Sequence, residues 1–254
     1  MNNRSFDFAR SAGLIVVLTL WWLASLMGQS NVLPGPVAVL RSAAQLLVAG
    51  TLVEHAAISL QRVLVGFALG TAAGVTLGMT VGLSRLAKRT IYILVEVLRP
   101  VPGIAWLPLA LLWFGLGEGP KYFLIAIGSF FPVFVGTLRG MQQTDPLHVR
   151  SAQALGSSRW QVIRDVIFPS ALPEILTAQR VGLSLGFIYM VAAELIGSQS
   201  GLGYIITHAR LSGLTDQIYV GILLVGALNL GLGTLQRAVE RYVLRWHVGL
   251  GGSP

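Results

Sequence analysis

Long runs of apolar side chains constrain this sequence more than any other feature. Five runs approach the roughly 20 residues that a helix needs to cross a lipid bilayer. They cover residues 12–28, 63–83, 122–138, 175–196 and 218–235. A sixth run, from Thr90 to Gly115, is apolar but interrupted by three prolines. We therefore expect an all-α integral membrane protein with about six transmembrane helices, forming a single domain over residues 1–254.

The composition supports this expectation. Hydrophobic residues make up 54% of the chain and charged residues only 11%, and the mean hydropathy is +0.72, which is rare in a soluble domain of this length. The absence of cysteine excludes disulfides and thiol-ligated metals. Because Gly28-Gln29-Ser30 is a poor cleavage site and further spans follow, the first run is interpreted as an anchor helix, not as a secretory signal.

The distribution of positive charge predicts the orientation of the chain. Lys and Arg are enriched in the short cytoplasmic loops of membrane proteins. Alternate loops carry most of these residues here, whereas the opposite loops hold only Arg41, Lys121 and Arg210. Both termini are therefore expected in the cytoplasm. The net charge of +8 reflects this topology, because a nucleic-acid surface would need basic residues gathered on one soluble face.

One segment on the predicted cytoplasmic side, SAQALGSSRWQVIRDVIFPSALP (residues 151–173), breaks the apolar pattern. Upstream of it, Asp145-Pro146 predicts a helix start, and Gly156 predicts a left-handed helix stop. Ser157 or Ser158 can cap a second, amphipathic helix, which we expect Pro169 to end. The helix pair is interpreted either as a docking site for a cytoplasmic partner or as an ordinary loop resting on lipid headgroups.

The spacing in this segment resembles the cytoplasmic loop of binding-protein-dependent ABC importer permeases. There, E-A-A is followed by three residues, Gly, nine residues, an aliphatic residue, one residue and Leu-Pro. Here the pattern falls on Arg150-Ser151-Ala152, Gly156, Val166 and Phe168-Pro169, so Arg150 replaces the glutamate and Phe168 the leucine. NVLPGPVAVL, SLQRVLVGFALG, LRPVPGIAWLPLALLWFGLGEGPK and VAAELIGSQSGLGYII are similar to the nitrate, sulfonate and taurine importer branch, and the similarity extends over residues 33–245.

This resemblance implies a type I importer permease fold, similar to the methionine importer, in the bacterial inner membrane, with a coupling loop at residues 144–170. The permease would bind no cofactor and hydrolyse nothing itself. The chain lacks a G-x-x-x-x-G-K-[ST] phosphate loop, so ATP and magnesium would belong to separate P-loop ATPase subunits. The other implied partners are a second, identical permease copy and a periplasmic or lipid-anchored substrate-binding protein. The residues implied in coupling are Arg150, Ser151, Ala152, Gly156, Ser157, Arg159, Trp160 and Pro169.

Charged residues within the apolar runs are candidates for a translocation path. A helix broken at Pro100 and Pro102 needs protein or water around it. Glu96 and Arg99, just before the break, can pair on one helix face, either as a structural ion pair or beside the substrate. Arg62 and Arg180 are interpreted first as side chains that snorkel to the membrane interfaces. Glu194 is interpreted as a residue that pairs with a charge or caps a helix. The path candidates are Arg62, Glu96, Arg99, Arg180 and Glu194.

Two further patterns concern packing and the outer side. Glycines recur at every fourth position from Gly66 to Gly82 and form a groove that lets a neighbouring helix approach closely. We expect this helix to belong to the same subunit in preference to a second copy. After Glu194, a Gly-Leu-Gly turn precedes a short apolar helix. This makes Gly201, Gly203 and Tyr204 candidates for docking a binding protein, and a shallow interfacial helix is the plainer alternative.

Two other function classes are weaker. The stretch from Gly182 to Gly186 matches the G-x-S-x-G pattern of a hydrolase, but no strand precedes it and no histidine lies within a span. A secondary transporter would need ion-coupling carboxylates in inverted repeats, and only Glu96 and Glu194 qualify. We therefore expect the permease of an ABC importer for a small anion, taurine or an alkanesulfonate first, with nitrate or bicarbonate as alternatives.

Overall fold

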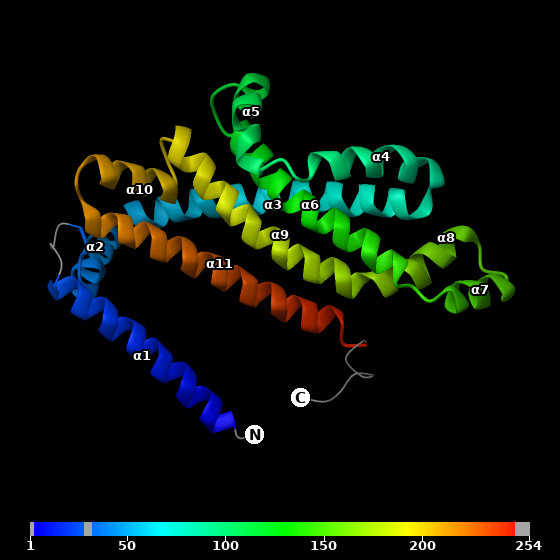
Figure 1. The fold of residues 1–254 in the computed structure, drawn as a ribbon, viewed down its shortest axis with the longest axis horizontal. Helices are drawn as coiled ribbons and strands as arrows, with labels where there is room; N and C mark the ends of the chain where they lie inside the picture. Colours follow the sequence, from blue (N-terminus) through cyan, green and yellow to red (C-terminus); the bar gives the residue numbers. More distant parts are fainter. Residues whose placement is uncertain (1–2, 28–31, 247–254) are drawn as a thin grey trace. The chain divides into compact units, whose positions relative to one another are not determined.

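The computed structural model describes residues 3–27 and 32–246, and within these ranges every regular element is helical (Figure 1). In chain order the elements are α1 (Asn3–Met27), α2 (Pro36–Val48), α3 (Thr51–Leu83), α4 (Arg85–Leu98), the 3₁₀ turn η1 (Gly103–Trp106), α5 (Leu107–Phe114), α6 (Gly119–Gln142), α7 (Pro146–Ala154), α8 (Arg159–Val162), the π turn η2 (Ile163–Ile167), α9 (Phe168–Gly197), α10 (Leu202–Leu211) and α11 (Thr215–Val243). The prediction of an all-α protein is confirmed for these residues.

Four helices of the described chain are long and apolar enough to cross a membrane. They are α3, α6, the continuous helix from Arg159 to Gly197, and α11. Two further segments, Arg85–Leu98 and Gly103–Phe114, pass the same test together but are bent by 98°, so they form a broken span or a re-entrant loop. The described chain therefore has four candidate membrane spans, or five if the bent pair is one span. The first predicted span falls on α1, within which Ile15–Met27 is a shorter apolar helix. Gly28-Gln29-Ser30 lies outside the described residues. The sixth span stays a prediction.

The chain groups into two compact units, one of residues 1–58 and 198–226 and the other of residues 59–197 and 227–254. In the first unit, the side chain of Trp21 links α1 to two neighbouring segments. The indole Nε1 of Trp21 donates to the carbonyl oxygen of Pro34 at 3.2 Å, and its ring stacks on Tyr219 of α11. The expectation of a single domain stays a prediction.

In the second unit, α6 and α9 pack against each other over much of their length (Figure 1). Small residues make this contact close. A Cβ atom added to Gly140 would lie 2.8 Å from the carbonyl oxygen of Ala171, and one added to Gly136 would collide with the side chain of Ala178. Ser129 adds a hydrogen bond, with its hydroxyl donating to the carbonyl oxygen of Gly182 at 3.1 Å. Such close backbone approach is typical of helix contacts in membranes.

The glycine series of α3 packs against α6 in the same unit. A Cβ atom added to Gly66 would lie 2.5 Å from the Cβ of Ile125, and one added to Gly78 would lie 2.8 Å from the Cβ of Thr137. At Gly70 the added atom would collide with the carbonyl oxygen of Ala126. The prediction that this groove serves packing within one subunit is confirmed.

We expect Gly70→Ala to lower the free energy of unfolding by about 1–3 kcal/mol, because the methyl group is forced onto a backbone oxygen in a packed interface. This loss would appear although alanine is favoured over glycine in a helix by about 1 kcal/mol. The measurement is thermal unfolding of the protein in detergent, followed by tryptophan fluorescence. Gly231→Ala in α11 is the control, since a Cβ there meets nothing within 4 Å. Equal shifts for both variants would contradict the packing argument.

Candidate functional site

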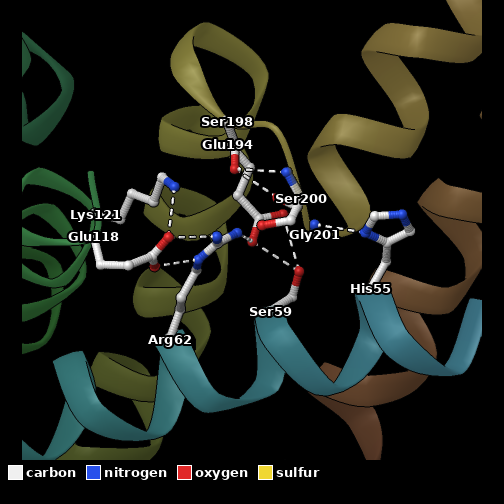
Figure 2. Close-up of polar contacts among 9 residues, drawn as sticks. All are labelled: His55, Ser59, Arg62, Glu118, Lys121, Glu194, Ser198, Ser200 and Gly201. Carbon is white, nitrogen blue, oxygen red and sulfur yellow. Dashed lines mark hydrogen bonds and ion pairs between the residues drawn. The ribbon is translucent and has the colours of Figure 1, made fainter. Parts of the chain in front are cut away.

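A cluster of charged and mostly buried side chains lies in the second unit (Figure 2). Its centre is Arg62 of α3, whose side chain is only 2% exposed. The guanidinium donates from Nε and Nη2 to the two carboxylate oxygens of Glu118, both at 2.6 Å. Its Nη1 donates to Oε1 of Glu194 at 2.7 Å. The cluster therefore ties α3 both to the residue that precedes α6 and to the end of α9.

Two neighbours complete the cluster. The hydroxyl of Ser59, one turn before Arg62, lies 2.8 Å from Oε1 and 2.9 Å from Oε2 of Glu194 and donates to this carboxylate. The ammonium of Lys121 donates to Oε1 of Glu118 at 2.8 Å. The hydrogen bond from Arg62 is the main reason that the pKa of Glu118 falls from 4.5 to about 2; partial burial opposes this fall and Lys121 adds to it. With two cations and two carboxylates, the cluster is balanced in charge.

This cluster corrects one expectation and confirms another. Arg62 does not snorkel to the membrane interface; it is buried, because two carboxylates from distant parts of the chain supply the partners that water would otherwise provide. Glu194 was expected to pair or cap, and it pairs. Sequence reasoning missed Ser59, Glu118 and Lys121, since nothing local marks them as neighbours of Arg62.

The interrupted apolar run forms a bend that contacts the rest of the protein at Gly103. Neither Pro100 nor Pro102 has an N–H group, so the helix of α4 cannot continue through them. The N–H of Gly103 donates to the hydroxyl of Tyr189 in α9 at 3.2 Å. Gly103 is buried against this ring, so its N–H is satisfied within the protein, whereas residues 98–102 of the bend are exposed.

A cavity of about 510 Å³ lies beside this bend, along the contact between α6 and α9. Its lining is mostly apolar, with Phe131 and Tyr189 among the aromatic residues. Three charged side chains also line it, namely Arg99, Arg139 and Glu174. A concave, largely apolar site with a few polar groups is the usual form of a small-molecule site. Arg139 and Glu174 were not predicted, because nothing in the sequence places them beside the bend.

The other path candidates take different places. Glu96 lies 3.8 Å from Arg99, and both side chains are about half exposed, so the predicted pair forms at the rim of the bend. Arg180 of α9 pairs with Glu240 of α11 and lines a second, separate cavity. The structure thus brings Arg62 together with Glu194, and Glu96 with Arg99, but it does not gather the five candidates into one site.

The predicted cytoplasmic helix pair is present. Asp145 caps α7 by accepting a hydrogen bond from the N–H of Leu147 at 2.8 Å, and Pro146 is the first helical residue. Gly156 follows α7 with φ of +87°, the left-handed conformation that favours glycine. Ser158, one of the two predicted caps, forms a capping box with Gln161 at the start of α8.

The expected end of this second helix at Pro169 is wrong. The chain remains helical from Arg159 to Gly197, so α8 continues directly into α9. The π turn η2 lies immediately before the proline and lets the helix pass it, because the wider turn changes which carbonyl groups need a partner. The hydroxyl of Ser170, directly after the proline, donates to the carbonyl oxygen of Val166 at 2.7 Å.

The candidate docking residues form a turn and a helix start in the first unit. Gly201 precedes α10 with φ of +103°, and its N–H donates to Nδ1 of His55 at 3.0 Å (Figure 2). Gly203 is buried, and the ring of Tyr204 lies between those of His55 and His208, with centroid distances of 5.5 and 5.7 Å. The short helix that the sequence predicts after the turn is therefore present as α10.

Comparison with known proteins identifies the family of this chain. Residues 70–245 match the binding-protein-dependent transport system inner membrane components. The chain belongs to this family. It is therefore a multi-pass membrane permease and a transport component.

Three relatives of this permease are similar over nearly their whole length. The taurine transport permease protein TauC of Escherichia coli is 39% identical over 243 residues, covering 92% of this chain and 88% of the relative. The putative aliphatic sulfonates permease SsuC of the same organism is 39% identical over 233 residues, covering 91% and 89%. The nitrate import permease NrtB of Synechocystis is 32% identical over 244 residues, covering 92% and 89%.

A solved structure agrees on the fold of the permease. A chain of the methionine ABC transporter MetNI, in an inward-facing conformation, superposes with a TM-score of 0.62 at 21% identity. The superposition covers 73% of this chain and 92% of the other. The predicted type I importer permease fold is thereby confirmed.

We expect Arg62→Met to cost about 3–5 kcal/mol of stability, because it leaves the Glu194 carboxylate buried without its cation. Glu194→Gln should cost less, since Arg62 keeps both bonds to Glu118. The double variant should cost less than the sum of the two, because it removes the buried charge and its partner together. The measurement is a double-mutant cycle on unfolding of the permease in detergent. Additive losses would show that the two side chains are not coupled.

Proposed function

We propose that this permease is the transmembrane subunit of an ATP-driven importer that moves a small organosulfonate, taurine or an alkanesulfonate, into the cell by alternating access. The continuous helix from Arg159 to Gly197 carries this proposal. One end of it belongs to the cytoplasmic helix pair, and residues further along it, Glu174 and Tyr189, line the cavity beside the bend. A displacement of the cytoplasmic helix pair can therefore be transmitted to the cavity through one continuous helix.

A separate P-loop ATPase would cause this displacement when it binds and hydrolyses ATP. The chain has no phosphate loop of its own. ATP and magnesium would therefore bind to the ATPase, and neither would bind to the permease. Helix α7 buries none of its side chains, and at the tip of the pair Leu155 is 88% exposed and Trp160 68%. Exposed apolar side chains on a capped helix fit a groove on a partner. Arg150, Ser151, Ala152, Ser157 and Arg159 would contribute to the same contact.

The cavity beside the bend would form part of the substrate path. Arg99 and Arg139 can attract a sulfonate group, and Arg139 forms no ion pair within the part of the chain that the structure describes. Glu174 adds one negative charge to the same lining. A substrate with both a sulfonate and an ammonium group, as in taurine, suits such a lining better than nitrate does. The balanced cluster around Arg62 would instead hold the outer ends of α3 and α9 beside this path.

The remaining partners follow from the proposed orientation, with both termini in the cytoplasm of a bacterial cell and the turn at Gly201 on the outer side. A periplasmic or lipid-anchored binding protein would deliver the substrate there, contacting Gly201, Gly203 and Tyr204. A second, identical permease would complete the path, because the cavity is open in a single chain.

We expect Gly156→Val to uncouple ATP hydrolysis from uptake. A side chain in the left-handed conformation costs about 1–2 kcal/mol, so the turn should change and uptake should fall about tenfold while hydrolysis continues. The measurement is uptake per ATP hydrolysed by the complex in proteoliposomes, after co-purification of the permease with its ATPase. Gly50→Val is the matched control, since Gly50 has a similar φ of +76° and no neighbour within 4 Å. Unchanged coupling in Gly156→Val, or failure of any ATPase to co-purify, would contradict the proposal.

We expect Glu174→Gln to slow uptake of taurine about 1.4- to fivefold relative to an alkanesulfonate, the effect of losing a partly exposed ion pair of roughly 0.2–1 kcal/mol. The alkanesulfonate has no ammonium group and should be transported as before. The measurement is competition between the two labelled substrates in cells that carry the complete transporter. Glu54→Gln in the first turn of α3 is the control, because Glu54 is exposed and lies outside the cavity lining. An equal fall for both substrates would contradict a role for Glu174 in recognition.

A further inference from the structure

A second cavity, of about 400 Å³, lies between α9 and the last turns of α11. Three arginines, one glutamate and one leucine line it, namely Arg180, Arg237, Glu240, Arg241 and Leu244. Arg237, Glu240 and Arg241 of α11, and Leu244 directly after it, lie at positions i, i+3, i+4 and i+7, so they form one face of the helix. Arg180 approaches this face from α9, where it pairs with Glu240.

The positive charges of this basic cavity are only partly compensated. Arg180 and Glu240 neutralise each other, whereas neither Arg237 nor Arg241 forms an ion pair or hydrogen bond among the residues that the structure describes. The Nε of Arg180 is moreover buried and has no hydrogen-bond acceptor. The cavity thus holds two uncompensated guanidinium groups and one unsatisfied donor. An anion with several acceptor oxygens would satisfy all three.

The surroundings place the basic cavity at the depth of lipid headgroups. The apolar run of α11 ends at Leu235, just before Arg237. Tyr242 and Trp246 follow with exposed rings, and Arg245 lies over the ring of Tyr242 at 5.7 Å. Exposed Tyr and Trp mark the membrane–water interface in membrane proteins. Only 11% of the apolar part of α11 is buried within the chain, so this helix presents most of its surface to its environment.

We propose that the basic cavity binds the phosphate headgroup of an anionic phospholipid of the cytoplasmic leaflet. Arginine recognises phosphate through pairs of parallel hydrogen bonds, and basic pockets between transmembrane helices on the cytoplasmic side suit anionic headgroups. Leu244 and the aliphatic stems of the arginines give the cavity a largely apolar lining, which offers a surface for an acyl chain. A soluble anion would use the guanidinium groups but not this apolar surface. This inference is independent of the transported substrate.

The test is native mass spectrometry of the permease released from nanodiscs that contain equal parts of phosphatidylglycerol and phosphatidylethanolamine. The wild type should retain phosphatidylglycerol. The double variant Arg237→Gln/Arg241→Gln should retain it about 30-fold less, since each basic residue near an anionic surface contributes about fivefold. Arg85→Gln/Arg89→Gln is the matched control, because this pair has the same spacing on α4 but lies outside the cavity lining. The control should retain the lipid like the wild type.

Two outcomes would overturn the proposal. Equal retention of both lipids by the wild type would exclude headgroup recognition, and this measurement needs no variant. Displacement of bound phosphatidylglycerol by millimolar inorganic phosphate or taurine would assign the cavity to a soluble oxyanion instead. Persistence of lipid against both competitors, together with its loss in the double variant alone, would support the lipid site.

Discussion

In a lipid bilayer no water is available to satisfy backbone polar groups, and the rest of this structure depends on that constraint. Helices satisfy it where the chain is regular. Where the chain is irregular, other parts of the protein must supply the partners. The hydroxyl of Tyr189 accepts from Gly103 at the bend after α4, and the π turn with Ser170 carries the helix past Pro169. Both devices lie on one continuous helix, so α9 is at once a span, a support for the bend and a wall of the main cavity.

The arginines of this permease show how neighbours decide what a charge can do. Arg62 is surrounded by two carboxylates and is buried, so it holds three segments of chain together and offers no net charge to a passing anion. Arg139 lines a cavity and has no carboxylate partner within the described chain. Arg237 lies in a second cavity beside the exposed aromatic residues of α11. The same side chain thus fits a structural, a substrate-binding and a lipid-binding role.

Structural features that depend on a few neighbouring residues were predicted correctly from the sequence. Asp145 and Ser158 act as helix caps, and Gly156 takes a positive φ, because a cap or a stop involves only residues within one turn. The broken span at Pro100 was predicted for the same reason. The end of the helix at Pro169 was not, since the local rule for proline is overridden when a π turn precedes it. The cluster around Arg62 was missed because Arg62 is 56 residues from Glu118 and 132 from Glu194.

The sequence by itself therefore determined the class of the protein, its helical spans, the spacing of the cytoplasmic segment and, through that spacing and the other motifs, its family. Only the tertiary structure decided which charges meet. It paired Arg62 with Glu118 and Glu194, and it gathered Arg99, Arg139 and Glu174 around one cavity. The physical reason is that span formation is set by hydrophobicity along one segment, whereas the cost of burying a charge depends on partners that only the packing of α3, α6, α9 and α11 brings within reach.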